Sequence, residues 1–199
     1  MKHYLGAIAV LGMATSSLAA VTQVGVFDGA LDDNFDSYTV QPVGPVFTFL
    51  GGIATNTSAG AQDIYISNGH GLGGSKGSYS SSNAMVANNG SGSTWTITFS
   101  TLMSRIGGYW QSAYDDSYLK FEFFDSGDNA TGTFQVTPPN TGELTWYGFE
   151  DAGGIAKVIV TSDQAYQIVD DFTADVVPEP ASMAALGLGA ATLIRRRRK

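Results

Sequence analysis

The clearest pattern along the chain is an alternation of apolar and polar residues in its second half. Residues 94–100 read TWTITFS, with Trp95, Ile97 and Phe99 at alternate positions and threonines between them. Residues 117–125 read SYLKFEFFD and again place apolar side chains at every second position. A period of two is that of a strand with one buried face. Both segments are therefore predicted to be half-buried β-strands.

Further strand candidates follow at regular spacing and are separated by polar turns. The segment DSGDNATG at 125–132 has the Asp, Asn and Gly content of a tight turn and lacks the glutamate that closes an EF-hand calcium loop. Regularly spaced short strands are typical of an antiparallel sandwich or barrel, so the predicted fold class is all-β, a single antiparallel β-sandwich. The other expected strands are VTQVGVF at 21–27, PVFTFL at 45–50, DIYISN at 63–68, a short piece at 84–87, TFQVTP at 133–138, LTWYGFE at 144–150, IAKVIVTSD at 155–163 and YQIVDDFTADV at 166–176.

The charge of the chain is uneven and excludes one class of partner. All 18 acidic residues lie between Asp28 and Glu179, where only four basic residues occur, so this region carries a formal charge of −14. Such a field repels nucleic acid and anionic membranes, and nucleic-acid binding is therefore excluded. The chain has no cysteine, which removes disulfides, thiol catalysis and cysteine-based zinc sites.

Residues 1–19 have the layout of a secretory signal peptide. Lys2 and His3 precede an apolar run that closes with TSSLAA, and small residues, Ser17 and Ala19, stand at the −3 and −1 positions of a cut after Ala19. The alternative is a membrane anchor, but the apolar run is too short to span a bilayer. We therefore expect export through a translocase, removal of residues 1–19 by signal peptidase, and an exported domain at 20–176.

Residues 177–199 combine three parts with different chemistry. The middle part, 181–194, is 14 residues without a charge; as a helix it would reach about 21 Å, against an apolar bilayer core of about 30 Å. Insertion into the membrane is therefore expected to be transient. The two prolines ahead of it remove backbone donors and hold the chain extended, as a protease cleft requires. The flanking parts are the motif Val177, Pro178, Glu179 and Pro180 and the basic tail Arg195, Arg196, Arg197, Arg198 and Lys199.

This three-part C-terminal end closely resembles the PEP-CTERM sorting signal of exported bacterial proteins. The resemblance implies recognition, and cleavage near the motif, by exosortase, a membrane-embedded protease-transpeptidase. It also implies an association with exopolysaccharide and biofilm, and a location in the cell envelope, at the outer surface or in the extracellular matrix of a Gram-negative bacterium. The run 181–194 is shorter and richer in Ala and Gly than a robust anchor, which argues against permanent membrane residence.

A second resemblance covers residues 95–172. The segments RIGGYW, FEFFD, GTF, WYGFE and YQIVDDF, in this order, look like the jelly-roll ectodomains found in front of this sorting signal, which are similar in shape to carbohydrate-binding modules. The resemblance implies a two-sheet sandwich and a binding role. We therefore expect a non-catalytic polysaccharide-binding or biofilm-associated protein. The alternatives are a secreted carbohydrate-active hydrolase on a similar sandwich and a structural or filament-forming surface protein.

Four aspartates are candidates for a structural calcium ion. Asp33 and Asp36 lie early in the domain, and Asp170 and Asp171 lie in its last expected strand. The first and last strands of a jelly-roll are commonly neighbours, and calcium binds six to eight oxygens. The hypothesis is an ion held by Asp36 and Asp171 with Asp33 or Asp170 assisting. The alternative is that Asp170 and Asp171 end a strand facing water.

Aromatic side chains are the candidates for ligand binding, because the apolar face of a sugar stacks on an exposed ring while polar groups take its hydroxyls. Most aromatic residues of a sandwich lie in its core. Trp110 and Tyr114 are expected to be exposed, because they flank a polar turn. The wider set of candidates also contains Tyr109, Tyr118, Trp146 and Tyr147.

Overall fold

A computed structural model describes residues 20–59, 64–68, 83–87, 93–112, 117–139, 143–163 and 167–178. The signal peptide expected at 1–19, the apolar run 181–194 and the basic tail 195–199 lie outside the described residues. In the described part of the chain, no helix is long and apolar enough to cross a membrane.

The described strands form one antiparallel sheet of 12 strands, which confirms the all-β antiparallel class. The expected short strand at 84–87 is present as β7. A single turn of 3-10 helix, η1 (Leu50–Gly52), follows β4. The strands are β1 (Thr22–Val24), β2 (Leu31–Asp33), β3 (Gln41–Gly44), β4 (Val46–Phe49), β5 (Ala54–Ser58), β6 (Ile64–Ser67), β7 (Ala84–Ala87), β8 (Thr94–Ser112), β9 (Leu119–Phe124), β10 (Ala130–Val136), β11 (Thr145–Ser162) and β12 (Gln167–Val176).

Two strands are much longer than the sequence indicated. β8 extends beyond the expected segment 94–100 to a total of 19 residues, and β11 joins the separate strands expected at 144–150 and 155–163 into one of 18 residues. Between Glu150 and Ile155 the register of β11 against β8 shifts, and Gly154 has a φ of 91°. Such bulges bend a strand without ending it. The glycine-containing stretch that reads as a loop is therefore a bend.

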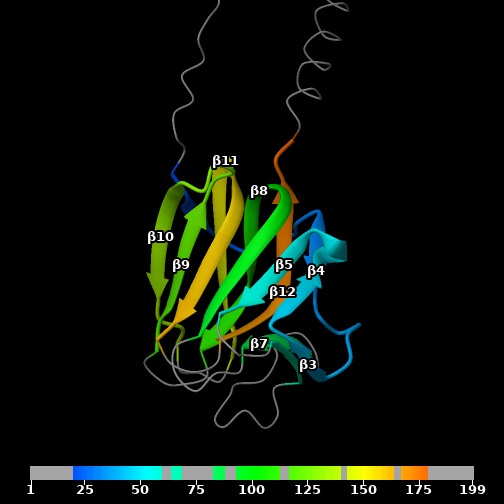
Figure 1. The fold of residues 1–199 in the computed structure, drawn as a ribbon. Helices are drawn as coiled ribbons and strands as arrows, with labels where there is room; N and C mark the ends of the chain where they lie inside the picture. The colour runs from blue at the N-terminus through cyan, green and yellow to red at the C-terminus, as the bar shows by residue number, and fades with distance from the viewer. Residues whose placement is uncertain are drawn as a thin grey trace, which may run out of the picture.

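These two bent strands fold the sheet into two layers (Figure 1). The first half of β8 pairs with β5 and with the second half of β11, which pairs in turn with β9. The second half of β8 pairs with the first half of β11 and with β12. The outer strands β10 and β4 extend the first layer, and β1, β2 and β7 extend the second.

The core lies between the two layers and is largely aromatic. The inward faces predicted for the strands at 94–100 and 117–125 are confirmed, since Trp95, Ile97, Leu119, Phe121 and Phe123 are all at most 1% exposed. Rings from the two layers meet there: Phe172 of β12 lies 5.3 Å from Phe49 of β4, and Trp110 of β8 lies 5.1 Å from Phe121 of β9.

The turn predicted at 125–132 is also present. The Asp125 carboxylate accepts hydrogen bonds from the backbone N–H groups of Gly127 at 2.8 Å and Asn129 at 2.9 Å. The Asn129 side-chain amide also donates to this carboxylate, and its hydrogen bonds, followed by those of the backbone, hold the pKa of Asp125 below its usual value. The acidic residues of this segment therefore close a β-turn between β9 and β10.

Candidate functional site

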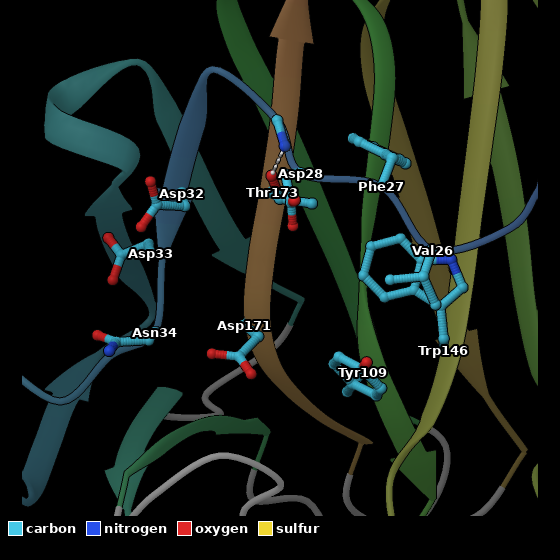
Figure 2. A pocket seen from close by; sticks show the side chains of 11 residues that line it. Val26, Phe27, Asp28, Asp32, Asp33, Asn34, Tyr109, Trp146, Asp171 and Thr173 are labelled. Atoms are coloured by element: carbon cyan, nitrogen blue, oxygen red, sulfur yellow. Dashed lines mark hydrogen bonds between the residues drawn. The ribbon is translucent and has the colours of Figure 1, made fainter.

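The segment between β1 and β2 crosses the outer face of the second layer. β1 pairs with β11 and β2 pairs with β12, while β8 lies between β11 and β12 in the sheet. Residues 25–34, which we call the strap, therefore pass over β8 from one side to the other (Figure 2). In β2, Asp33 is paired with Phe172 and Asp32 with Thr173. Asp32 and Asp33 therefore lie beside the last strand, whereas the first strand, β1, lies beside β11.

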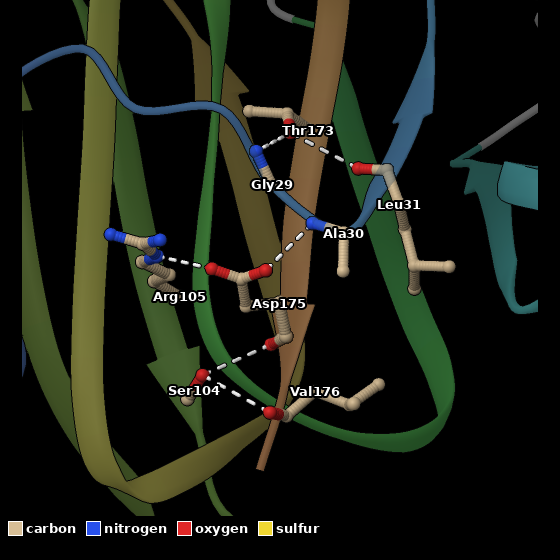
Figure 3. A network of polar contacts seen from close by, with 8 residues as sticks. All are labelled: Gly29, Ala30, Leu31, Ser104, Arg105, Thr173, Asp175 and Val176. Atoms are coloured by element: carbon tan, nitrogen blue, oxygen red, sulfur yellow. Dashed lines mark hydrogen bonds and ion pairs between the residues drawn. The ribbon is translucent and has the colours of Figure 1, made fainter. Parts of the chain in front are cut away.

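The strap is fixed to β12 by a short series of hydrogen bonds (Figure 3). The Gly29 N–H donates to the Thr173 hydroxyl at 2.9 Å, and that hydroxyl donates to the Leu31 carbonyl at 3.0 Å. The Ala30 N–H donates to the Asp175 carboxylate at 2.7 Å. A Cβ atom on Gly29 would lie 2.3 Å from the Thr173 hydroxyl oxygen. Only glycine lets the strap approach β12 this closely.

Arg105 of β8 completes the attachment of the strap. Its guanidinium forms an ion pair with Asp175 and lies 4.2 Å from the centre of the Phe27 ring, a cation–π contact. Partial burial pushes the pKa of Asp175 upward, but the hydrogen bond from Ala30 and the contact with Arg105 outweigh it, so this pKa lies below its usual value. The carboxylate is therefore held in its charged form, as the strap contacts require.

A pocket of about 390 Å³ lies between the strap and β8, β11 and β12. Figure 2 shows aromatic side chains on one side of it, the acidic side chains of β2 and the amide of Asn34 on the other, and Asp171 of β12 between them. The volume falls in the range of small-molecule binding sites. Most of its lining residues come from the strap, so the pocket exists only because the strap is docked.

The aromatic side of the pocket is built over two glycines. Gly107 of β8 and Gly148 of β11 are register partners, and the Trp146 indole lies across both, since their Cβ atoms would stand 2.5 Å and 2.9 Å from its ring atoms. Phe27 and Tyr109 meet this indole edge to face, at centroid distances of 5.5 Å and 5.3 Å. The three rings form a partly exposed aromatic wall.

On the acidic side, a β-bulge turns Asp171 toward the pocket. The register of β12 against β8 shifts between Asp170 and Thr173, and Asp171 has a φ of 49°. Aspartate is one of the few residue types that adopt this left-handed conformation readily. Strained backbone of this kind is concentrated at functional sites, and a bulge is a common way to re-aim a side chain.

The remaining carboxylates of the pocket differ in what they already bind. Asp33 accepts hydrogen bonds from the N–H groups of Phe35 and Leu50, both at 3.0 Å, and from the Tyr38 hydroxyl at 2.9 Å. Burial, and then the hydrogen bond to Asp33 and its charge, raise the pKa of Tyr38 to about 12. Asp33 therefore organises the chain after β2, whereas Asp28 and Asp32 are exposed at the pocket rim.

The four aspartates proposed for calcium do not come together. Asp33 and Asp171 line the pocket, whereas Asp36 and Asp170 do not. Asp36 instead accepts a hydrogen bond from the Asn34 amide at 3.3 Å, and Asp170 is fully buried and accepts one from the Asp171 N–H. Among the described residues, no group of three or more His, Cys, Asp or Glu side chains is arranged to hold a metal ion.

The expected exposure of Trp110 is wrong, and Tyr114 lies outside the described residues. Trp110 is 2% exposed and packs among the core rings because β8 continues to Ser112, which keeps position 110 on the inward face. Tyr109 and Trp146, from the wider aromatic set, are the residues at the pocket. The alternation along β8 predicts that Tyr109 and Trp110 face opposite sides of the sheet, since neighbouring strand residues do so.

The C-terminal end of the domain is marked by the last hydrogen bonds of β12. The Ser104 hydroxyl contacts the carbonyls of Asp175 at 3.2 Å and Val176 at 3.3 Å (Figure 3). The Val177 N–H donates to the Leu102 carbonyl at 2.9 Å, and Pro178, the last described residue, is exposed. The sheet therefore ends where the motif expected at 177–180 begins.

Comparison with a family model identifies the segment that follows the domain. Residues 176–199 match the PEP-CTERM protein-sorting motif, which confirms the expectation for this end of the chain. No protein of curated function matches the sequence.

Solved structures with some likeness to the chain include carbohydrate-binding modules and a phage protein. TmCBM61 in complex with β-1,4-galactotriose is 12% identical, with 61% of this chain and 86% of that chain covered and a TM-score of 0.42. A family 11 carbohydrate-binding module of a Clostridium thermocellum cellulosomal cellulase is 10% identical, with 72% and 98% covered and a TM-score of 0.33. The enzymatically active domain of bacteriophage CBA120 tailspike protein 4 is 13% identical, with 62% of this chain but only 19% of that chain covered and a TM-score of 0.41.

Proposed function

We propose that this chain, which carries a PEP-CTERM sorting motif and belongs to the exosortase-substrate class, is a surface protein that binds polysaccharide without cleaving it. The domain at 20–176 is exported, loses its signal peptide, and is cut near Pro178 by exosortase. It then acts at the outer surface or in the extracellular matrix of a Gram-negative bacterium. The observation that carries the proposal is the pocket with an aromatic wall on a domain that ends at a sorting motif.

The junction at the end of β12 supports processing at this position. The last backbone hydrogen bond into the sheet is made by Val177, and Pro178 is exposed. A protease needs an extended and accessible segment, and proline holds the chain extended. A cut beyond Val177 leaves every described hydrogen bond of β12 in place. The apolar run 181–194 serves only to place this segment at the membrane while exosortase reads it.

The pocket supports binding of a sugar. Partly exposed rings of Trp146, Tyr109 and Phe27 offer an apolar surface for one face of a pyranose. The Asp28 and Asp32 carboxylates at the rim are placed to accept hydrogen bonds from sugar hydroxyls. A mostly apolar wall with a few polar groups is the general construction of a small-molecule site. Exopolysaccharide of the producing cell is the proposed partner.

The processing half of the proposal is tested by mass spectrometry of the protein from its native host and from a strain lacking exosortase. We expect a mature chain that begins at Ala20 and ends near Pro178 in the wild type. In the mutant strain we expect the C-terminal residues to remain. A chain retaining Arg195–Lys199 in the wild-type envelope would contradict the processing scheme.

The binding half is tested with the mature protein on a glycan array, followed by calorimetry. We expect measurable affinity for at least one polysaccharide, and loss of that affinity in Trp146→Ala. Release of new reducing ends from the bound polysaccharide would show a hydrolase and overturn the non-catalytic assignment.

A further inference from the structure

The pocket behind the strap has an uneven charge. Four carboxylates line it, those of Asp28, Asp32, Asp33 and Asp171. Among the described lining residues, none is Lys, Arg or His. A bound anion would therefore meet negative charge from both the strap and β12, with no lining cation to offset it.

Arg105, which contacts a residue of the pocket wall, does not change this balance. Arg105 contacts Phe27 on the strap, but its guanidinium forms an ion pair with Asp175. Both residues line a separate hollow of about 730 Å³ rather than this pocket. The charge of Arg105 is thus compensated outside the pocket, and the pocket keeps its negative potential.

The aromatic wall favours the same sign of charge as the carboxylates. Trp146, Tyr109 and Phe27 present rings whose faces attract cations, with Trp the most effective. One face of Phe27 already receives a cation, since Arg105 lies 4.2 Å from its centroid. An ammonium group entering the pocket would meet the Trp146 or Tyr109 ring on one side and the Asp32 or Asp171 carboxylate on the other.

We infer that the pocket selects a polysaccharide whose sugar units carry a free amino group. This inference rests on the proposed function, because it names the chemistry of the polysaccharide bound at that site. The sugar ring packs on the aromatic wall, and its ammonium group lies among the carboxylates. Neutral sugars bind more weakly, and uronate or sulfated polymers are excluded by repulsion. A volume of about 390 Å³ holds a sugar ring, far more than a bare metal ion needs.

The test compares three β-1,4-linked hexamers that differ only at C2 of each unit: glucosamine, N-acetylglucosamine and glucose. The same comparison is made for β-1,6-linked hexamers, with oligogalacturonate as the anionic probe. Calorimetry is performed on the mature protein at low salt and in 1 M NaCl. We expect the glucosamine series to bind about fivefold to tenfold more tightly than its neutral counterparts, as one or two exposed ion pairs supply. High salt, with a screening length of about 3 Å, should reduce that preference to less than twofold.

Variants separate the charge of the pocket from its shape. Asp32→Asn and Asp171→Asn should remove most of the preference for glucosamine, measured as the ratio of its affinity to that of the matching neutral hexamer. Asn tolerates the left-handed backbone of position 171. Asp128→Asn, in the turn between β9 and β10, removes one negative charge away from the pocket and should change neither affinity. Trp146→Ala should weaken all hexamers alike.

The outcomes distinguish this inference from the function on which it rests. Equal or tighter binding of the neutral or acetylated hexamers, lost in Trp146→Ala, would overturn the amino-sugar inference and leave polysaccharide binding intact. Binding of glucosamine hexamers that Asp32→Asn and Asp171→Asn leave unchanged would place the ammonium group elsewhere and also overturn the inference. Absence of binding by every hexamer and by the anionic probe would overturn both.

Discussion

The attachment of the strap to β12 makes Gly29 the most sensitive glycine of the pocket. Its Cβ in a Gly29→Ala variant would lie 2.3 Å from the Thr173 hydroxyl oxygen and 2.6 Å from the Ala174 carbonyl oxygen. The hydroxyl can rotate away, but Ala174 is fully buried in the sheet and its backbone cannot move at small cost. The strap must therefore lift from β12.

The expected loss of stability follows from the hydrogen bonds that this movement breaks. Beside the pairing of β2 with β12, three hydrogen bonds tie the strap to β12: Gly29 to Thr173, Thr173 to Leu31 and Ala30 to Asp175. Neutral hydrogen bonds contribute about 1 kcal/mol each and one to a carboxylate somewhat more. Alanine also stabilises the variant by about 0.5 kcal/mol, because it restricts the unfolded chain. The net destabilisation is about 2 to 3 kcal/mol, which lowers Tm by about 5 to 10 °C for a domain of this size.

The measurement is thermal unfolding of the mature protein, followed by glycan binding below the transition. Gly25→Ala is the matched control, because it lies in the same strap and its Cβ would meet nothing within 4 Å. We expect Gly25→Ala to leave Tm and binding unchanged or to raise Tm slightly. Gly29→Ala should lower Tm and abolish binding at the pocket. A Gly29→Ala variant with the Tm of the wild type and full affinity would refute the close approach of the strap.

Three further predictions concern the core, the contacts of Asp175 with the strap and Arg105, and the C-terminal end of the domain. Trp110→Ala should lower stability by about 3 to 5 kcal/mol in chemical denaturation, because it leaves a cavity among core rings; an exposed Trp110 would give less than about 1 kcal/mol. Because the pKa of Asp175 is lowered in the folded protein, the stability that this carboxylate contributes is fully present above the usual carboxyl pKa of 3.8 and is lost as the pH falls through the folded value. Asp175→Asn should flatten that part of the curve of Tm against pH. An unchanged curve would show that the contacts of Asp175 with Ala30 and Arg105 contribute nothing to stability. A chain ending at Pro178 should unfold at the same Tm as one extending to Lys199, whereas removal of Val177 as well should lower Tm, since Val177 makes the last hydrogen bond to Leu102.

Short stretches of sequence determine much of the domain's local structure. The alternation in residues 94–100 and 117–125 determined which side chains are buried, because successive strand residues face opposite sides whatever the fold. The Asp and Asn content of 125–132 determined a turn, since these side chains hydrogen-bond their own backbone. The C-terminal motif could also be identified from the sequence, because it is defined by the order of its residues and not by a folded surface.

The pocket was decided only by the tertiary structure. Residues 25–34 and position 146 are far apart in the chain, and nothing local indicates that the strap crosses β8 to meet Trp146. The exposure of Trp110 was predicted wrongly because it depends on how far β8 continues. The bends that keep β8 and β11 continuous are set by pairing between distant strands. Asp171 faces the pocket because of a bulge whose register is fixed by β8. Local patterns determine which face of a strand is apolar, whereas a binding site requires long-range contacts that no short window of sequence contains.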